Sequence, residues 1–176
     1  QFVDEVKGGA IPFNFIPAVE KGVREVLTQG FIAGYPMQDI KVTVYDGKSH
    51  PVDSKEVAFV AAGRKAMLDA LAKASPTLLE PIAKLTITAP TVTLGDIAGD
   101  LASRRGQVLN TVATSSTSME ILATVPLAEM DGYAARLNAM TQGAAVFTFE
   151  FYAYQPAPMQ KQQELAAKYQ RKDEDD

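Results

Sequence analysis

Cysteine, an excess of positive charge and long apolar runs are all missing from this sequence. None of its 176 residues is cysteine, which excludes disulfides and thiolate metal sites and fits a cytoplasmic protein. No stretch approaches the roughly 18 apolar residues that a membrane-spanning helix needs, and no signal peptide is visible. The formal net charge is −4, whereas nucleic-acid-binding domains are usually basic. Any contact with RNA must therefore come from local patches or from regions outside this chain.

Residues that could carry catalysis are also scarce. His50 is the only histidine; no nucleophile is visible for it to activate and no metal-ligand cluster surrounds it, so on its own it resembles an ordinary loop residue. Asp96 and Asp100 lie four residues apart like a pair of acid–base carboxylates, but helix capping and a salt bridge explain them better. No GxxxxGK[ST] phosphate loop occurs. We therefore expect no enzyme active site and no cofactor within this chain.

The stretch from residue 81 to residue 154 carries the clearest fold signal. Its hydrophobic pattern predicts the order strand, helix, strand, strand, helix, strand, which is the ferredoxin-like βαββαβ plan. The expected strands cover residues 84–89, 106–113, 119–125 and 146–154. The second helix is expected to have Pro126 in its first turn and to stop at Gly143.

The first helix of that stretch has recognisable end signals. Thr93 and Asp96 have the spacing of an N-terminal capping box. Arg104 and Arg105 fall in the expected last turn, where cations oppose the negative end of the helix dipole. Gly106 can then close the helix in the left-handed conformation. One apolar face is formed by Leu94, Ile97, Ala98 and Leu101.

The amino-terminal part predicts a smaller unit of strand, helix, strand and helix. The first helix is expected to have Asn14 as a possible cap and to end at Gly30; the second is expected to run from about residue 55 to 74. The second helix has an apolar stripe of Phe59, Ala62, Ala66 and Ala70. This incomplete βαβα unit needs further strands upstream of Gln1, and the chain begins without methionine inside a strand-like stretch. We therefore expect a piece of a longer protein.

The whole chain is accordingly expected to be an α+β protein with two small α/β-sandwich domains. The expected domains cover residues 1–77 and 78–157, followed by a closing helix and acidic tail over 158–176. The helix is predicted from Met159 to about Tyr169, and the tail ends in Asp173–Asp176, which is expected to be frayed.

Motifs across nearly the whole chain resemble the carboxy-terminal third of the translation elongation factor G family. These motifs are Gly34-Tyr35-Pro36, Asp46-Gly47, His50, Val52-Asp53-Ser54, Leu79-Glu80-Pro81-Ile82, Gly95-Asp96, Gly99-Asp100-Leu101, Ser103-Arg104-Arg105-Gly106-Gln107, Val125-Pro126-Leu127-Ala128-Glu129-Met130, Gly132-Tyr133 and Thr141-Gln142-Gly143. Each is weak alone, but together they are specific. The resemblance implies most of that family's fourth domain, followed by its ferredoxin-like fifth domain and a closing helix.

The resemblance also implies a function in protein synthesis. In the family, the fourth domain enters the decoding site during translocation of tRNA and messenger RNA, and the fifth domain docks near the GTPase-associated centre. The implied partners are rRNA, tRNA and ribosomal proteins. GTP and Mg²⁺ belong to an upstream GTPase domain that this chain does not contain. The expected protein is cytoplasmic and monomeric and does not associate with membranes.

Two groups of residues become candidate RNA contacts through the resemblance. The loop Asp46-Gly47-Lys48-Ser49-His50 matches the family's decoding-site tip, and its histidine can hydrogen-bond to nucleotides or stack on them. Pro51, where an acidic residue is common, is expected to stiffen this tip. Arg104, Arg105 and Gln107 are candidate rRNA contacts. For the two arginines, dipole neutralisation and an ion pair from Asp100 to Arg104 remain equally good explanations.

Other functions remain open at this stage. The hydroxyl-rich loop 114–118 and the pair Ala144-Ala145 replace segments that often carry basic residues in the family. A paralogue specialised for ribosome recycling or ribosome protection is therefore one alternative. A protein-interaction module using the open sheet is another. Phe147, Phe149 and Phe151 alternate on one strand face, where core packing is favoured over base stacking.

Overall fold

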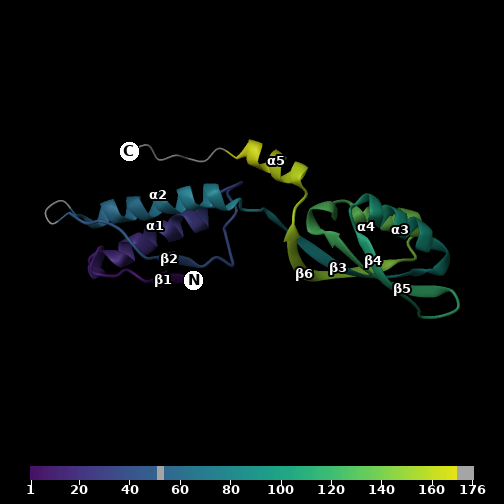
Figure 1. The fold of residues 1–176 in the computed structure, drawn as a ribbon. Coiled ribbons are helices and arrows are strands. Elements are labelled where there is room, and N and C mark those ends of the chain that lie inside the picture. The colour runs from purple at the N-terminus through teal and green to yellow at the C-terminus, as the bar shows by residue number, and fades with distance from the viewer. Residues whose placement is uncertain (51–53, 170–176) are drawn as a thin grey trace. The chain divides into compact units, whose positions relative to one another are not determined.

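The computed structural model describes residues 1–50 and 54–169. The chain divides into two compact units, and each is described here by itself (Figure 1). Unit 1 comprises Gln1–Leu78 together with the residues from Pro158 onward, and unit 2 comprises Leu79–Ala157. The expected stiffening by Pro51 and the expected acidic tail lie outside the described residues.

Unit 1 is a small α/β unit with the chain order βαβα and a closing helix, and it confirms the predicted fold class. Strands β1 (Phe2–Asp4) and β2 (Val42–Val44) pair in parallel, with Phe2 opposite Val42. The remaining elements are the 3₁₀ turn η1 (Phe13–Phe15) and helices α1 (Ile16–Gln29), α2 (Glu56–Ala74) and α5 (Met159–Lys168). Helices α1 and α2 lie over the same face of the two strands (Figure 1).

Helices α1 and α2 pack closely because each has a glycine where they meet. A Cβ atom at Gly22 would lie far inside contact distance of the carbonyl oxygen of Val60. One at Gly63 would lie 2.5 Å from the carbonyl oxygen of Val19. The predicted apolar stripe of α2 was displaced by one residue, since Ala62, Ala66 and Ala70 are exposed. The buried stripe contains Phe59, Gly63, Met67 and Leu71.

The closing helix α5 contacts other parts of unit 1. The Gln162 side-chain oxygen accepts a hydrogen bond of 3.1 Å from the backbone N–H of Leu78. Beyond the helix, the hydroxyl of Tyr169 donates to the carbonyl oxygen of Gln29 at 3.4 Å. The ring of Tyr169 also occupies the space that a side chain at Gly34 would need. Helix α5 thus contacts Leu78, and Tyr169 contacts the end of helix α1 and the turn that follows it.

Unit 2 has the predicted ferredoxin-like fold. Its sheet has the order β4-β5-β3-β6, in which all neighbouring strands are antiparallel. In chain order the elements are β3 (Leu79–Pro90), η2 (Thr91–Thr93), α3 (Leu94–Ser103), β4 (Gln107–Ala113), β5 (Ser118–Pro126), η3 (Leu127–Glu129), α4 (Tyr133–Thr141) and β6 (Val146–Pro156). Helices α3 and α4 cover one face of this sheet (Figure 1).

The core of unit 2 lies between that face and the two helices. Alternate residues of the central strands point inward, so Leu85 and Ile87 of β3 and Ile121 of β5 are completely buried. Ile97 and Leu101 of α3 cover them from the helix side. Burying a Leu or Ile side chain contributes about 1.5–3 kcal/mol, so this layer is the main source of stability in the unit.

Three predicted helix starts were wrong in detail. Thr93 makes no side-chain cap; its hydroxyl donates to the carbonyl oxygen of Pro90 at 2.8 Å, because a 3₁₀ turn leads into the helix. Asn14 likewise lies within the 3₁₀ turn η1 and caps nothing. Pro126 ends strand β5, and α4 begins only at Tyr133, after Gly132 takes a φ of 66°.

Candidate nucleic-acid interface

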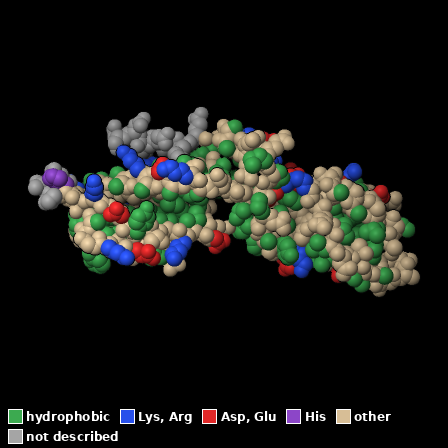
Figure 2. Space-filling model, in the orientation of Figure 1, with side chains coloured by type: hydrophobic (Ala, Val, Ile, Leu, Met, Phe, Trp, Pro, Cys, Tyr) green, Lys and Arg blue, Asp and Glu red, His purple; other side chains and the backbone are tan. Residues whose placement is uncertain are grey.

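The loop Asp46–His50 leaves strand β2 at one end of unit 1. Hydrogen bonds order the start of this loop and its far end. The carboxylate of Asp46 accepts the N–H of Gly47 at 2.8 Å, and the hydroxyl of Ser54 accepts the N–H of His50 at 2.8 Å. The N–H of Ser54 donates in return to the carbonyl oxygen of His50 at 3.3 Å. Residues 48–50 are exposed. The loop therefore exposes a surface that includes the only histidine of the sequence (purple in Figure 2).

Gly47 has a packing role rather than a turn role. Its φ is not positive, so the Asp46-Gly47 pair does not form a turn that needs a left-handed glycine. Instead, a Cβ at this position would lie 2.5 Å from a terminal carbon of the Ile11 side chain, which is buried. The β1–α1 connection thus packs directly under the base of the His50 loop. No pattern in the sequence signals this contact.

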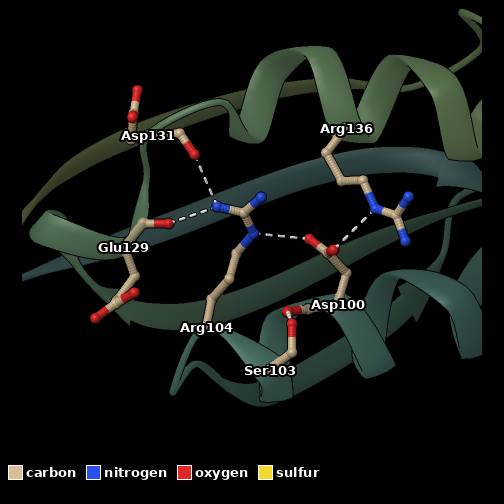
Figure 3. A network of polar contacts seen from close by, with 6 residues as sticks. All are labelled: Asp100, Ser103, Arg104, Glu129, Asp131 and Arg136. Carbon is tan, nitrogen blue, oxygen red and sulfur yellow. Dashed lines mark hydrogen bonds and ion pairs between the residues drawn. The ribbon is translucent and has the colours of Figure 1, made fainter.

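Arg104 lies in a network of polar contacts at the end of helix α3 (Figure 3). Its Nε donates to the carboxylate of Asp100 at 2.9 Å, which confirms the predicted i,i+4 pair. Its Nη1 donates to the carbonyl oxygens of Glu129 at 2.6 Å and Asp131 at 3.0 Å. Asp100 also accepts from Nε of Arg136 at 3.1 Å. Arg104 therefore ties α3 to the connection between η3 and α4.

Arg105, not Gly106, closes helix α3 in the left-handed conformation, with a φ of 62°. The N–H of Gly106 donates to the carbonyl of Leu101 at 2.7 Å, and that of Arg105 donates to the carbonyl of Ala102 at 3.0 Å. These two bonds form a Schellman motif. Gly106 is required for space, because a Cβ there would lie 3.0 Å from the carbonyl oxygen of Thr124 on the neighbouring strand. The predicted role of Gly106 was therefore wrong.

The side chain of Arg105 lies between two carboxylates. Its two terminal nitrogens donate to Glu80 at 2.7 and 2.9 Å, and one of them also donates to Glu129 at 2.9 Å. The hydrogen bond to Glu80 is the largest influence raising the pKa of Arg105, and Glu129 adds to it against partial desolvation. A forked arginine is well matched to this bidentate arrangement, which joins the start of β3 to η3.

Two of the three predicted rRNA contacts, Arg104 and Arg105, lie at the same end of α3. Both guanidinium groups donate hydrogen bonds to acceptors within the protein. Gln107 follows as the first residue of β4 and is exposed. A phosphate would have to compete with Asp100 for Arg104 and with Glu80 for Arg105. Contact with rRNA by these residues stays a prediction.

Tyr133 is buried beside this network, and its hydroxyl has no hydrogen-bond partner among the described residues. The guanidinium carbon of Arg104 lies 5.3 Å from the centre of its ring, and the Phe147 ring meets it edge-on at 5.1 Å. Burial and the negative charge of Asp100 raise the pKa of Tyr133 to about 12, against an opposing effect of Arg104. The hydroxyl therefore stays neutral at any physiological pH.

We expect Tyr133→Phe to stabilise the chain by about 1 kcal/mol, because it removes an unpaired buried hydroxyl and keeps the ring. The gain should grow between pH 10 and about 12. In that window the unfolded tyrosine ionises while the folded one does not, so the wild type loses about 2–3 kcal/mol that the variant keeps. Urea unfolding at pH 7 and across this window measures both effects. Equal curves for the two proteins at all pH values contradict the prediction.

The three phenylalanines of β6 lie on the helix-covered side of the sheet. Phe147, Phe149 and Phe151 pair with the buried residues Ile87, Leu85 and Ala83, respectively, so they share the inner face. Phe147 packs against the core, as predicted, whereas Phe149 and Phe151 are exposed, so the favoured core packing was wrong for these two rings. The alternating residues of the open face include Lys84 opposite Glu150. This placement gives no support to base stacking by these rings on the open sheet.

Neither a metal centre nor a membrane span is found among the described residues. No group of three or more His, Cys, Asp or Glu side chains in this part of the chain could hold a metal ion. None of the helices described is both long enough and apolar enough to cross a bilayer.

Comparison with known proteins gives a consistent result. The sequence matches the families described as "Elongation factor G, domain IV" over residues 1–75 and "Elongation factor G C-terminus" over residues 77–165. Proteins named elongation factor G from two strains of Dehalococcoides mccartyi are 51% identical over 158 residues. That alignment covers 90% of this chain and 23% of each relative.

A solved structure resembles the chain as well. A crystal structure from Thermus thermophilus superposes with a TM-score of 0.80 and 36% sequence identity, covering 95% of this chain and 25% of that one. The chain thus spans about a quarter of the length of the relatives that it matches.

Proposed function

The chain belongs to the elongation factor G family, and from this premise we propose that it is the ribosome-engaging carboxy-terminal module of a translational GTPase. In this proposal the parent protein promotes translocation of tRNA and messenger RNA. The observation that carries it is the tandem match to domain IV and to the C-terminus over nearly the whole chain. The exposed His50 loop, in which the N–H of His50 donates to the hydroxyl of Ser54, adds support from the structure.

The module acts mechanically in this proposal and performs no chemistry itself. GTP and Mg²⁺ bind to an upstream domain of the parent, whose hydrolysis cycle repositions the module. The His50 loop then holds the tRNA–messenger complex as it moves, and unit 2 contacts the large subunit. The partners are rRNA, tRNA and ribosomal proteins, and the parent is a monomeric cytoplasmic protein. A fixed loop base suits this role, because a steric element must not yield under load.

Single-round translocation by the full-length parent with GTP tests this proposal. We expect His50→Ala to slow translocation about tenfold, the equivalent of about 1.4 kcal/mol in the barrier, while GTP hydrolysis on ribosomes continues at the wild-type rate. The reason is that the substitution removes an exposed side chain and leaves the loop backbone bonds to Ser54 in place. Lys65→Ala is the matched control, because Lys65 is an exposed residue of helix α2.

Two results would contradict the proposal. A wild-type parent that hydrolyses GTP on ribosomes but does not translocate would be better explained as a paralogue specialised for recycling or protection. A parent without ribosome-dependent GTP hydrolysis would exclude the translational GTPase altogether. Normal translocation by His50→Ala would leave the module in place but remove the role proposed for its histidine.

A further inference from the structure

The connection between β1 and α1 lies at the same end of unit 1 as the His50 loop. Because β1 and β2 run in parallel, the segments that follow them leave the same edge of the sheet. The pairing continues past the strands, since the N–H of Glu5 donates to the carbonyl oxygen of Val44 at 2.8 Å. The two connections then meet where the Ile11 side chain fills the space beside Gly47. They form one surface with a shared base.

Two consecutive glycines shape the β1–α1 connection. Gly8 and Gly9 both have left-handed backbones, with φ of 66° and 70°. No atom lies within 4 Å of the position that a Cβ would take at either residue, and both residues are exposed. The left-handed backbone, rather than packing within the chain, accounts for glycine at both positions. Without side chains, this stretch of backbone is also open to close approach by another molecule.

Lysine and aromatic residues are found in this connection and in or beside the neighbouring His50 loop. Lys7 precedes the glycines and Lys48 lies in the neighbouring loop; both are exposed, and neither forms an ion pair within the described part of the chain. Phe13, at the end of the same connection, is 85% exposed, and Tyr45, directly before the His50 loop, is 74% exposed. Two lysines without an ion pair and two exposed aromatic rings therefore lie in or directly beside the two connections.

Three carboxylates lie near these two loops: those of Asp4 and Asp46 accept backbone hydrogen bonds and keep their charge, and that of Glu5 is exposed. The carboxylate of Asp4 accepts the N–H of Val6 at 2.9 Å, and that of Asp46 accepts the N–H of Gly47 at 2.8 Å. Lysines, exposed aromatic rings and open backbone together are the features by which proteins bind single-stranded nucleic acid without reading its sequence.

We propose that the segment Lys7–Phe13 forms a second RNA-binding loop beside the His50 loop. In this arrangement Lys7 contacts a phosphate, the Gly8-Gly9 backbone permits the RNA strand to approach, and Phe13 stacks on a base or ribose. The inference rests on the proposed function and deepens it, because it adds residues to the surface that holds the tRNA–messenger complex. The Ile11–Gly47 contact fixes the spacing of the two loops.

Translocation by the full-length parent at two or more salt concentrations tests this proposal, with wild type, His50→Ala and Lys65→Ala measured beside the new variants. We expect Lys7→Ala to slow translocation about fivefold at low salt and to reduce the salt dependence by about one counterion, as loss of one phosphate contact does. Phe13→Ala should slow translocation by a similar factor without changing the salt dependence, since stacking involves no ion release. Lys7→Arg should restore both properties.

The outcomes separate this inference from the function on which it rests. If the wild type translocates and His50→Ala is slow, but Lys7→Ala and Phe13→Ala match Lys65→Ala, the second loop is overturned and the proposed function stands. If Lys7→Arg is as slow as Lys7→Ala, the phosphate contact by Lys7 is overturned, because arginine keeps the positive charge. If the wild-type parent does not translocate at all, both proposals fall together. Because Lys7 and Phe13 are exposed, the variants should keep the wild-type unfolding curve, which circular dichroism checks.

Discussion

Gly22→Ala should destabilise unit 1 by about 3 kcal/mol or more, the upper end of the range for overpacking a closely packed site. The added methyl group would overlap the carbonyl oxygen of Val60 and lie 2.9 Å from the backbone nitrogen of Arg64. Both atoms belong to the backbone of helix α2, so no side-chain rotation can relieve the overlap. The helices would have to separate, and the buried residues on both sides, such as Val26 and Met67, would lose contacts.

The measurement is urea unfolding followed by circular dichroism, with hydrogen exchange in α1 and α2 to assign the loss to unit 1. Gly95→Ala in helix α3 is the matched control, because it makes the same chemical change where no atom lies within 4 Å. Alanine is the better helix former by about 1 kcal/mol, so this control should gain stability. If Gly22→Ala proved as stable as Gly95→Ala, the close approach of α1 and α2 at Gly22 would be wrong.

Glycines within helices differ in whether a neighbouring element packs against them. Gly95 and Gly99 both lie within helix α3, yet the space around both is open. Gly63, by contrast, lies where helix α2 closely approaches Val19 of another helix, α1. A glycine in a helical pattern indicates a missing side chain but not which neighbour, if any, approaches it. That information lies in another element of the fold.

Element order and fold class could be predicted because they follow from local periodicity. The ferredoxin-like order of unit 2 follows from alternating strands and from helical stripes such as that of Ile97 and Leu101. The helix ends were less predictable. The expected cap at Thr93 failed because the preceding residues form a 3₁₀ turn, and Arg105 took the conformation expected of Gly106. Such details depend on neighbouring strands, which local spacing does not describe.

Some contacts of the candidate site could likewise be predicted from the sequence, and others could not. The His50 loop was identified through the resemblance to a family, and the ion pair of Asp100 and Arg104 through helical spacing. The partner of Arg105, Glu80, lies 25 residues away on another element, and no sequence pattern connects them. The contact of Ile11 with Gly47 likewise depends on the parallel pairing of β1 and β2. Contacts of this kind arise from topology and therefore appear only in three dimensions.

Asp100→Ala should destabilise unit 2 by about 3 kcal/mol, the lower end of the range for breaking a buried ion pair. The side chain of Asp100 is 8% exposed and that of Arg104 is 19% exposed, so removing the carboxylate leaves a largely buried guanidinium without its counter-ion. The same carboxylate also holds Arg136 at 3.1 Å. Urea unfolding gives the free energy, and hydrogen exchange at residues 129–133 reports whether the connection to α4 loosens.

Asp96→Ala is the matched control, because Asp96 is an exposed carboxylate on the same helix and has no ion pair among the residues described. We expect it to cost about 0.5 kcal/mol, the size of a dipole interaction in the first turn. Asp100→Asn should fall between the two, since it keeps a hydrogen-bond acceptor and loses the charge. If Asp100→Ala lowered the free energy of unfolding no more than Asp96→Ala, the ion pair of Asp100 and Arg104 would contribute little to stability. The guanidinium would then be available to a phosphate, and the predicted rRNA contact at this end of α3 would become the better explanation of its presence.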